Sequence, residues 1–109
     1  MITVLARIEI FEGKEIDAVA EFKKMVEGVH QNEPGCLIYA VSRGNANTRE
    51  FYVFEVYRDR ESYDAHRKTD HMRTFQRAMD DYMDNSSFNV ESLRQIAGFT
   101  RDPIEHIDG

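Results

Sequence analysis

The amino-acid sequence predicts an α+β domain with the ferredoxin-like order βαββαβ, in which helices cover one face of an antiparallel sheet. Two observations predict this class. Four segments read as strands, and segments with helical periodicity fill the first and the last interval between them. With 109 residues, the chain is also close to the commonest size of a single domain. We expect one domain over residues 1–99, followed by a loosely held tail over residues 100–109.

The first strand and the first helix have clear patterns. Residues 2–11 form the expected strand, because apolar residues alternate with partly polar neighbours at Ile2, Val4, Ala6, Ile8 and Ile10. A turn at residues 12–14 leads into a helix over residues 15–31, whose apolar positions recur at helical spacing: Ile16, Val19, Phe22, Val26 and Val29. The segment NEPG, residues 32–35, ends this helix because proline and glycine do not continue it.

Two strands follow in quick succession. The segments CLIYAVS, residues 36–42, and REFYVFEVY, residues 49–57, are separated by a short polar loop, which predicts an antiparallel hairpin. Asp59 is then a good N-cap for a second helical region, which runs to about Met83 and could break near KTDH. The segment DNSS, residues 84–87, ends this region, and residues 88–99 form the last strand.

Both faces of the strand over residues 49–57 are largely apolar or aromatic. Alternate residues point to opposite sides of the sheet: Phe51, Val53, Glu55 and Tyr57 to one, and Tyr52, Phe54 and Val56 to the other. Helices on one side only would leave one of these rows exposed to water, and an apolar patch of that size usually marks an interface. We therefore expect a homodimer in which two sheets pack face to face.

The composition argues against several classes of function. The net charge of −6 argues against nucleic-acid binding, and no apolar run approaches the roughly 20 residues needed to span a bilayer. The N-terminus lacks the pattern of a signal peptide, so we expect a cytoplasmic protein. The lone Cys36 excludes an internal disulfide and reads as a small buried residue. Motifs for nucleotide, zinc-hydrolase and serine-hydrolase sites are absent from the sequence, and we expect neither a cofactor nor a metal.

The segments PGCLIY, residues 34–39, and FYVFEVYRDRESYDAHRKTDHM, residues 51–72, resemble the antibiotic biosynthesis monooxygenase family of dimeric α/β-barrel proteins. The shared pattern is a Pro-Gly turn into a strand, an acidic residue and an aromatic residue at the end of the next strand, and a helix that carries two histidines. The resemblance covers about residues 2–98 and implies the ferredoxin-like fold and the homodimer. The family includes quinol and polyketide oxygenases, haem degraders and an isomerase that processes a phosphorylated product of the autoinducer-2 quorum signal.

The polyketide-oxidising members imply a site without flavin, metal or haem, because the deprotonated substrate itself passes an electron to oxygen. Their pocket tryptophan, tyrosine and arginine fall on Tyr57, Tyr63 and Arg77 of this chain. A strand asparagine of that pocket falls on Val53, so its hydrogen bond is missing. In the haem-degrading members the proximal histidine falls near Gln76, which is not an ordinary iron ligand, so haem binding is not expected.

Two histidines are candidates for proton chemistry. An unperturbed imidazole titrates near pH ~6.5, so His66 could take a proton from a phenol or an enediol. The alternative is a half-buried histidine hydrogen-bonded to a group such as Glu55. His71 follows at i+5, which on a continuous helix turns it roughly 140° away and makes a shared metal improbable. If the segment KTD breaks the helix, His71 can swing back, with Thr69 or Asp70 as the cap of the next helix.

Glu55 is the third candidate, because a carboxylate inside an aromatic strand is costly unless it is paired. It is either one half of an internal ion pair, with Arg7 as a possible partner, or a general base or orienter of a histidine. Both interpretations remain open from the sequence.

The leading interpretation is a cofactor-independent monooxygenase that acts on a small electron-rich aromatic or quinol substrate. His66 would be the base or the anion stabiliser, Tyr57 and Tyr63 would line the slot, and Arg77 would aid anion binding. The second interpretation is an isomerase of a small phosphorylated carbonyl compound, in which two histidines move a proton and a cationic side chain meets the anionic group; the candidates are Arg7, Arg43, Arg77 and Lys68. The third is a non-enzymatic dimeric module that binds a small molecule.

Overall fold

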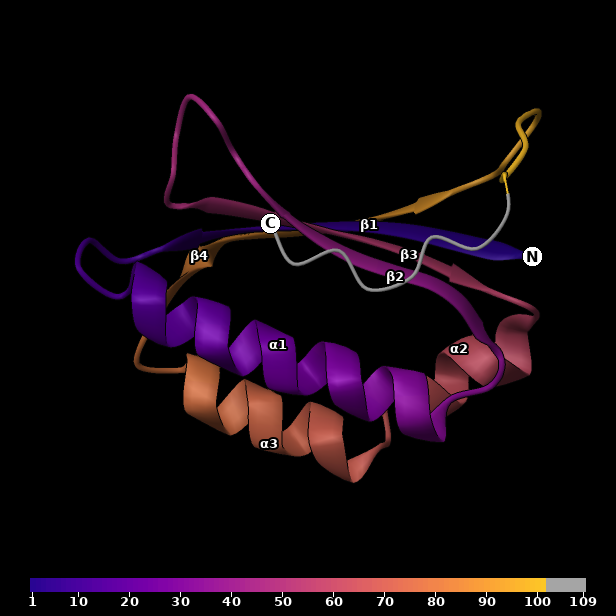
Figure 1. The fold of residues 1–109 in the computed structure, drawn as a ribbon, viewed down its shortest axis with the longest axis horizontal. Coiled ribbons are helices and arrows are strands. Elements are labelled where there is room, and N and C mark those ends of the chain that lie inside the picture. The colour runs from indigo at the N-terminus through magenta and orange to yellow at the C-terminus, as the bar shows by residue number, and fades with distance from the viewer. Residues whose placement is uncertain (102–109) are drawn as a thin grey trace.

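The computed structural model describes residues 1–101 and has seven elements in the order expected for a ferredoxin-like fold, with the second helix divided in two. Their bounds are β1 Ile2–Ile10, α1 Glu15–Asn32, β2 Cys36–Arg43, β3 Glu50–Tyr57, α2 Arg60–His66, α3 Asp70–Met79 and β4 Met83–Leu93. All three helices lie on one side of the sheet (Figure 1). In the part of the chain that is described, no helix is both long and apolar enough to cross a membrane.

The four strands form one antiparallel sheet in the order β2-β3-β1-β4. β1 is central and pairs with both β3 and β4, with Val4 opposite Glu55 and Ala6 opposite Val53. The hairpin expected between the second and third strands is confirmed, because β2 pairs with β3 along its length and places Tyr39 opposite Glu55. This register puts Glu55 on the helix-covered face in the middle of three neighbouring strands.

The hydrophobic core lies between the sheet and the helices. Phe22 of α1 stacks on Phe51 of β3, with ring centroids 5.4 Å apart, and contacts Phe75 of α3 at 5.0 Å. Ile10 and Met79 are fully buried in the same cluster. Burying a side chain of this size contributes about 1.5–3 kcal/mol. The core therefore fixes α1 and α3 against β3, which is the strand that carries Glu55 and Tyr57.

The sequence interpretation was wrong about the end of the second helical region. The last helix ends at Met79, not near Met83, and the segment DNSS lies inside β4 instead of preceding it. Asp, Asn and Ser favour turns by bonding to nearby backbone. Here Asp84 accepts such bonds from Ser86, but it also pairs across the sheet with Glu9 of the central strand, and this long-range pairing decides the structure. The strand then ends at Leu93, six residues before the expected limit.

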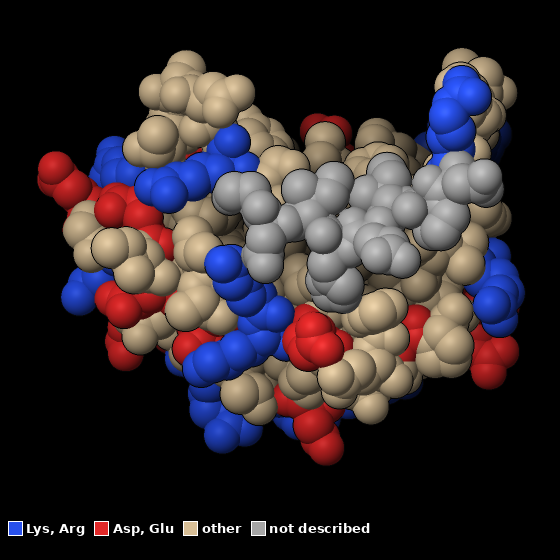
Figure 2. Space-filling model, in the orientation of Figure 1, with Lys and Arg blue, Asp and Glu red and all other residues tan. Residues whose placement is uncertain are grey.

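The second face of the sheet carries no helix among the described elements (Figure 1). Phe54 and Leu93 lie on this face, opposite Leu5 and Thr3 of β1, and are 40% and 41% exposed. Acidic and basic side chains are interspersed over the surface that Figure 2 displays, so no large field of one sign faces the viewer. The expectation that helices cover only one face of the sheet is confirmed.

Candidate active site

Three element ends converge beside the end of β3. Glu33 is the C-cap residue of α1, and its backbone N–H donates to the carbonyl oxygen of Val29 at 2.9 Å. His66 is the last residue of α2, and His71 is the second residue of α3. The ends of all three helices therefore bring an ionisable side chain to the same place.

The carboxylate of Glu33 bridges the two imidazoles. His66 Nδ1–H donates to Oε1 and Oε2 of Glu33 at 2.9 Å and 3.0 Å, and His71 Nε2–H donates to Oε2 at 2.5 Å. Burial raises the pKa of Glu33, but the hydrogen bonds from both histidines outweigh it, so the pKa lies below its ordinary value. An ionised carboxylate can only accept hydrogen bonds. Each imidazole therefore carries its proton on the nitrogen that faces Glu33, and this fixes the tautomer of a neutral His66 with its lone pair on Nε2.

The opposite side of the His66 ring faces Glu55. The distance from His66 Nε2 to Glu55 Oε1 is 3.8 Å, which is longer than a hydrogen bond. The Tyr57 hydroxyl donates to the same Glu55 oxygen at 2.5 Å. Burial raises the pKa of Glu55 above its ordinary value, although the bond from Tyr57 works in the other direction. The Glu55 carboxyl is thus a group that can hold a proton more readily than an exposed glutamate.

Aromatic rings enclose this side of the site. The rings of Tyr57 and Tyr39 lie 5.4 Å and 5.8 Å from the His66 ring, and Tyr63 lies 5.2 Å from Tyr57. His66 and Tyr57 are 3% and 0% exposed. Burial also raises the pKa of Tyr57, which keeps its hydroxyl protonated as a donor to Glu55. The His66 ring therefore lies among the rings of Tyr39 and Tyr57, with Glu55 on the Nε2 side.

A break in the helical region brings the two histidines together. Thr69 caps α3 by accepting from Met72 N–H at 3.2 Å, and its own hydroxyl donates to the His66 carbonyl oxygen at 2.9 Å. The chain therefore changes direction between His66 and Asp70 instead of continuing as one helix. The interpretation in which His71 points away from His66 is wrong for this reason, and the alternative with a break and a cap at Thr69 is confirmed.

Two glycines allow the close approach of neighbouring elements. A Cβ atom on Gly28 of α1 would lie 2.9 Å from both Cβ and Cγ of His71, closer than side chains tolerate. A Cβ atom on Gly35 would lie 2.1 Å from Oγ of Ser62 in α2. Glycine is unfavourable inside a helix, and at Gly28 it leaves the space that the His71 ring occupies.

The sequence interpretation found some members of the site and missed one. His66, Glu55, Tyr57 and Tyr63 lie together, and His71 joins them through Glu33. Glu33 itself was read only as part of the segment that ends a helix. The signal that could have identified it is its position directly before the Pro-Gly turn. This turn leads into β2, which pairs with β3 beside Glu55.

One pairing suggested from the sequence differs from the structure, and one assignment stays a prediction. Arg7 does not pair with Glu55, because the residues point to opposite faces of the sheet; Arg7 Nη1 instead lies 3.2 Å from Oε1 of Glu50. Arg77 is exposed in the last turn of α3, about 9 Å along the helix axis from His71. Its expected role in binding an anionic substrate stays a prediction.

Glu33, His66 and His71 are the described residues whose donor atoms could hold a metal ion, since these atoms lie within 4.8 Å of one another. In a tetrahedral zinc site with bonds of about 2.0–2.1 Å, neighbouring donor atoms lie about 3.3 Å apart. Here the nitrogen and oxygen atoms are 2.5–3.0 Å apart, which are lengths of hydrogen bonds. We therefore interpret Glu33, His66 and His71 as a cluster that is joined by hydrogen bonds.

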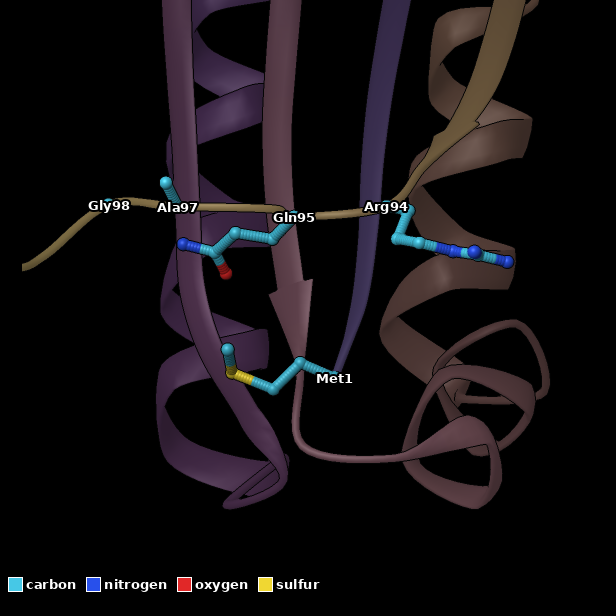
Figure 3. Close-up of a pocket in the computed structure, with 5 residues that line it drawn as sticks. All are labelled: Met1, Arg94, Gln95, Ala97 and Gly98. Carbon is cyan, nitrogen blue, oxygen red and sulfur yellow. The ribbon is translucent and has the colours of Figure 1, made fainter.

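The surface of the described residues includes the following two hollows. One of about 430 Å³ lies near the end of β4 and is lined by Met1, Arg94, Gln95, Ala97 and Gly98 (Figure 3). The other, of about 170 Å³, lies between α1 and α3 and is lined by Glu21, Lys24, Met25, His71, Thr74 and Phe75. Only the second hollow contains a member of the cluster.

Cys36 is less buried than the sequence suggested. It is half-buried at the start of β2, and its thiol donates to the carbonyl oxygen of Ile38 at 3.4 Å. Burial, together with the charges of Glu33 and Glu55, raises its pKa to about 12. Because the thiolate is the nucleophile, the raised pKa makes Cys36 a poor nucleophile at neutral pH.

We expect the replacement Glu33→Gln to lower the free energy of unfolding at neutral pH by about 2 kcal/mol, because hydrogen bonds to a buried charged acceptor are lost. The pKa of Glu33 is lower in the folded protein, so its contribution is present above the unfolded pKa, about 4.5, and is lost as the pH falls through the folded pKa. The difference between wild type and variant should therefore shrink below about pH 4.5. Urea unfolding at a series of pH values measures it.

The matched control is Glu27→Gln, which changes an exposed glutamate of the same helix and should leave stability within about 0.5 kcal/mol of wild type. A difference between wild type and Glu33→Gln that grows toward acid pH would contradict the assignment of Glu33 as an ionised bridge.

Comparison with known proteins identifies a family and several similar solved structures. The family model described as antibiotic biosynthesis monooxygenase matches residues 1–78. No match was found among curated proteins. A Pseudomonas aeruginosa protein of known structure is 25% identical, with a TM-score of 0.79, over 88% of this chain and 94% of that chain.

Two further solved structures are similar. A Caulobacter crescentus protein of the antibiotic biosynthesis monooxygenase type is 26% identical, with a TM-score of 0.82, over 88% of this chain and 90% of that chain. A Lactobacillus acidophilus protein of the monooxygenase type is 27% identical, with a TM-score of 0.80, over 85% of this chain. The alignment spans only 43% of that longer protein.

Proposed function

Because the chain belongs to the antibiotic biosynthesis monooxygenase family, we propose that it is a monooxygenase that oxidises a small electron-rich aromatic or quinol substrate with molecular oxygen. The observation that carries the proposal is the buried His66, which Glu33 orients so that Nε2 faces the aromatic end of β3. A base held in one tautomer beside aromatic walls is what deprotonation of a phenol requires.

In the proposed reaction, His66 Nε2 takes the proton of a substrate hydroxyl. The resulting imidazolium is stabilised by Glu33, which lies 2.9 Å from Nδ1. The electron-rich anion then passes an electron to oxygen, and aromatic side chains such as Tyr57 exclude water from the anion. For a simple quinol the products are a hydroxyquinone and water. The substrate supplies all the electrons, so the balance needs no external reductant.

Oxygen dependence tests this proposal. Quinols and flavonoid-like phenols would be screened with an oxygen electrode, and each substrate that is turned over would be tested again under anaerobic conditions. We expect one oxygen molecule to be consumed per substrate and turnover to stop without oxygen. Turnover that continues unchanged under anaerobic conditions would exclude oxygenation.

A specific observation favours a second candidate, an isomerase of a small phosphorylated carbonyl compound. Glu55, with its raised pKa, and His66 Nε2 face each other across 3.8 Å, so one group could remove a proton that the other returns to a neighbouring carbon. Incorporation of solvent deuterium into the product without oxygen uptake would identify this reaction. A ligand-binding module would instead keep its ligand after His66→Ala.

We also propose that the protein is a homodimer that packs through the open sheet face. Phe54 and Leu93 are exposed there, and the register places them beside Leu5 and Thr3 of β1. Sedimentation equilibrium should give a mass of about twice the 12.7 kDa of one chain. Phe54→Lys should shift the mass toward the monomer, whereas a wild-type mass of one chain would contradict the proposal.

A further inference from the structure

We infer that His71 and Glu33 form a proton relay that connects the buried His66 to solvent at the hollow between α1 and α3. The inference rests on the proposed role of His66 as an acid–base group, and it gives that group a route to water that does not pass through the substrate. Three features of the structure support it: the position of one oxygen atom, the increase in exposure along the chain of groups, and a glycine that makes room for the outermost ring.

One oxygen atom lies within hydrogen-bond reach of both histidines. Glu33 Oε2 is 3.0 Å from His66 Nδ1 and 2.5 Å from His71 Nε2. A proton on this oxygen can therefore pass to whichever of the two nitrogens is unprotonated, without rotation of the carboxyl group. If the two histidines contacted different oxygens of Glu33, the carboxyl group would have to rotate to carry a proton from one to the other. A carboxylate that only held the two rings in place would not need to contact both through the same oxygen.

Exposure increases from the buried end of the chain of groups to the outer end. The side chains of His66 and Glu33 are 4% and 8% exposed, whereas that of His71 is 18% exposed. His71 also lines the hollow of about 170 Å³, whose rim carries an ion pair between Lys24 and Glu21 at 3.1 Å. Water in this hollow can exchange protons with His71, whereas His66 lies behind Glu33.

The transfer is balanced in protons and needs no other reactant. In the outward direction, His66 begins as an imidazolium. His71, whose proton lies on Nε2 at rest, first moves this proton to Nδ1 by exchange with water in the hollow, which leaves Nε2 free to accept. The Nδ1–H bond of His66 breaks as an Oε2–H bond forms on Glu33, and this proton then forms the Nε2–H bond of His71. His71 finally releases its Nδ1 proton to water. The inward transfer is the reverse sequence, and it restores the proton on His66 Nδ1.

Gly28 provides an independent way to disturb the relay. A methyl group at this position would lie 2.9 Å from Cβ and Cγ of His71, so the ring must move. Alanine is a better helix former than glycine, so α1 itself is not weakened by the change. The substitution therefore tests the position of the imidazole without removing it.

The experiment measures proton exchange at His66 without a substrate. In protein labelled with ¹⁵N-histidine, NMR gives the exchange rate of the His66 Nδ1 proton with water for wild type, His71→Gln, His71→Ala and Gly28→Ala. A glutamine amide can still donate a hydrogen bond to Glu33, but it does not carry protons. We expect at least about tenfold slower exchange in His71→Gln and His71→Ala and slower exchange in Gly28→Ala. Free imidazole should restore the rate in His71→Ala by binding in the enlarged hollow.

The control is His30→Gln, an exposed histidine of α1, for which exchange should match wild type. Wild-type exchange rates in both His71 variants would overturn the relay. Slow exchange in His71→Ala that imidazole leaves unchanged, together with normal exchange in His71→Gln, would also overturn it, because His71 would then only position Glu33. Because no substrate is used, the relay can fail or hold independently of the proposed oxygenase reaction.

Discussion

Replacement of His66 by glutamine is expected to lower kcat/KM for the true substrate by about 10²–10⁴, the usual contribution of a positioned base. The glutamine amide can donate to Glu33, as Nδ1–H of His66 does at 2.9 Å. It has no basic nitrogen on the side that faces Glu55. The loss should therefore appear in kcat, while the binding of a substrate analogue changes little.

Steady-state kinetics and circular dichroism of His66→Gln test this prediction together. His30→Gln, which changes an exposed histidine of α1, is the matched control and should keep wild-type kinetics. Unchanged kcat/KM in folded His66→Gln would remove His66 from the chemistry and would favour a binding module.

Replacement of Tyr57 by alanine is expected to lower the free energy of unfolding by about 3–5 kcal/mol, the usual cost of truncating a buried aromatic ring. Tyr57 is 0% exposed, and its ring contacts those of Tyr63 and His66. Since a domain of this size is stable by only about 5–15 kcal/mol, this is a large fraction of the total. Urea unfolding with an unchanged m-value measures the effect.

Tyr57→Phe separates packing from hydrogen bonding. It keeps the ring but removes the hydroxyl that donates to Glu55 at 2.5 Å. We expect a cost of about 1–3 kcal/mol, because Glu55 is buried and loses a donor. Phe99→Ala, at a residue that is 78% exposed, is the control and should change stability by no more than about 0.5 kcal/mol. Equal costs for Tyr57→Phe and Phe99→Ala would contradict the buried Tyr57–Glu55 bond.

Much of the fold could be predicted because its signals are local. Alternation along residues 2–10 and 50–57 identified the strands, and the apolar positions that include Phe22 identified the first helix. Alternation also separated the two faces of β3, so Glu55 and Tyr57 were assigned together. The end of the second helical region was misread, because Asp84 and its neighbours favour turns locally but pair with the central strand in the fold.

The candidate site was only partly predictable because it depends on contacts between residues distant in sequence. His66 and His71 were identified, but the carboxylate that joins them lies more than thirty residues earlier, at Glu33. The likeness to oxygenase pockets directed attention to Arg77, which is exposed in α3. The role of Gly28 becomes clear only from its distance to the His71 ring.

The bridge from His66 through Glu33 to His71 is the feature on which the site depends. The most direct measurement is the ¹⁵N NMR spectrum of the imidazole nitrogens at neutral pH, in wild type and in Glu33→Gln. We expect the proton of neutral His66 on Nδ1 and that of His71 on Nε2, with both signals altered in the variant. A bare Nδ1 on His66, or signals of both histidines that are unchanged in Glu33→Gln, would contradict the bridge.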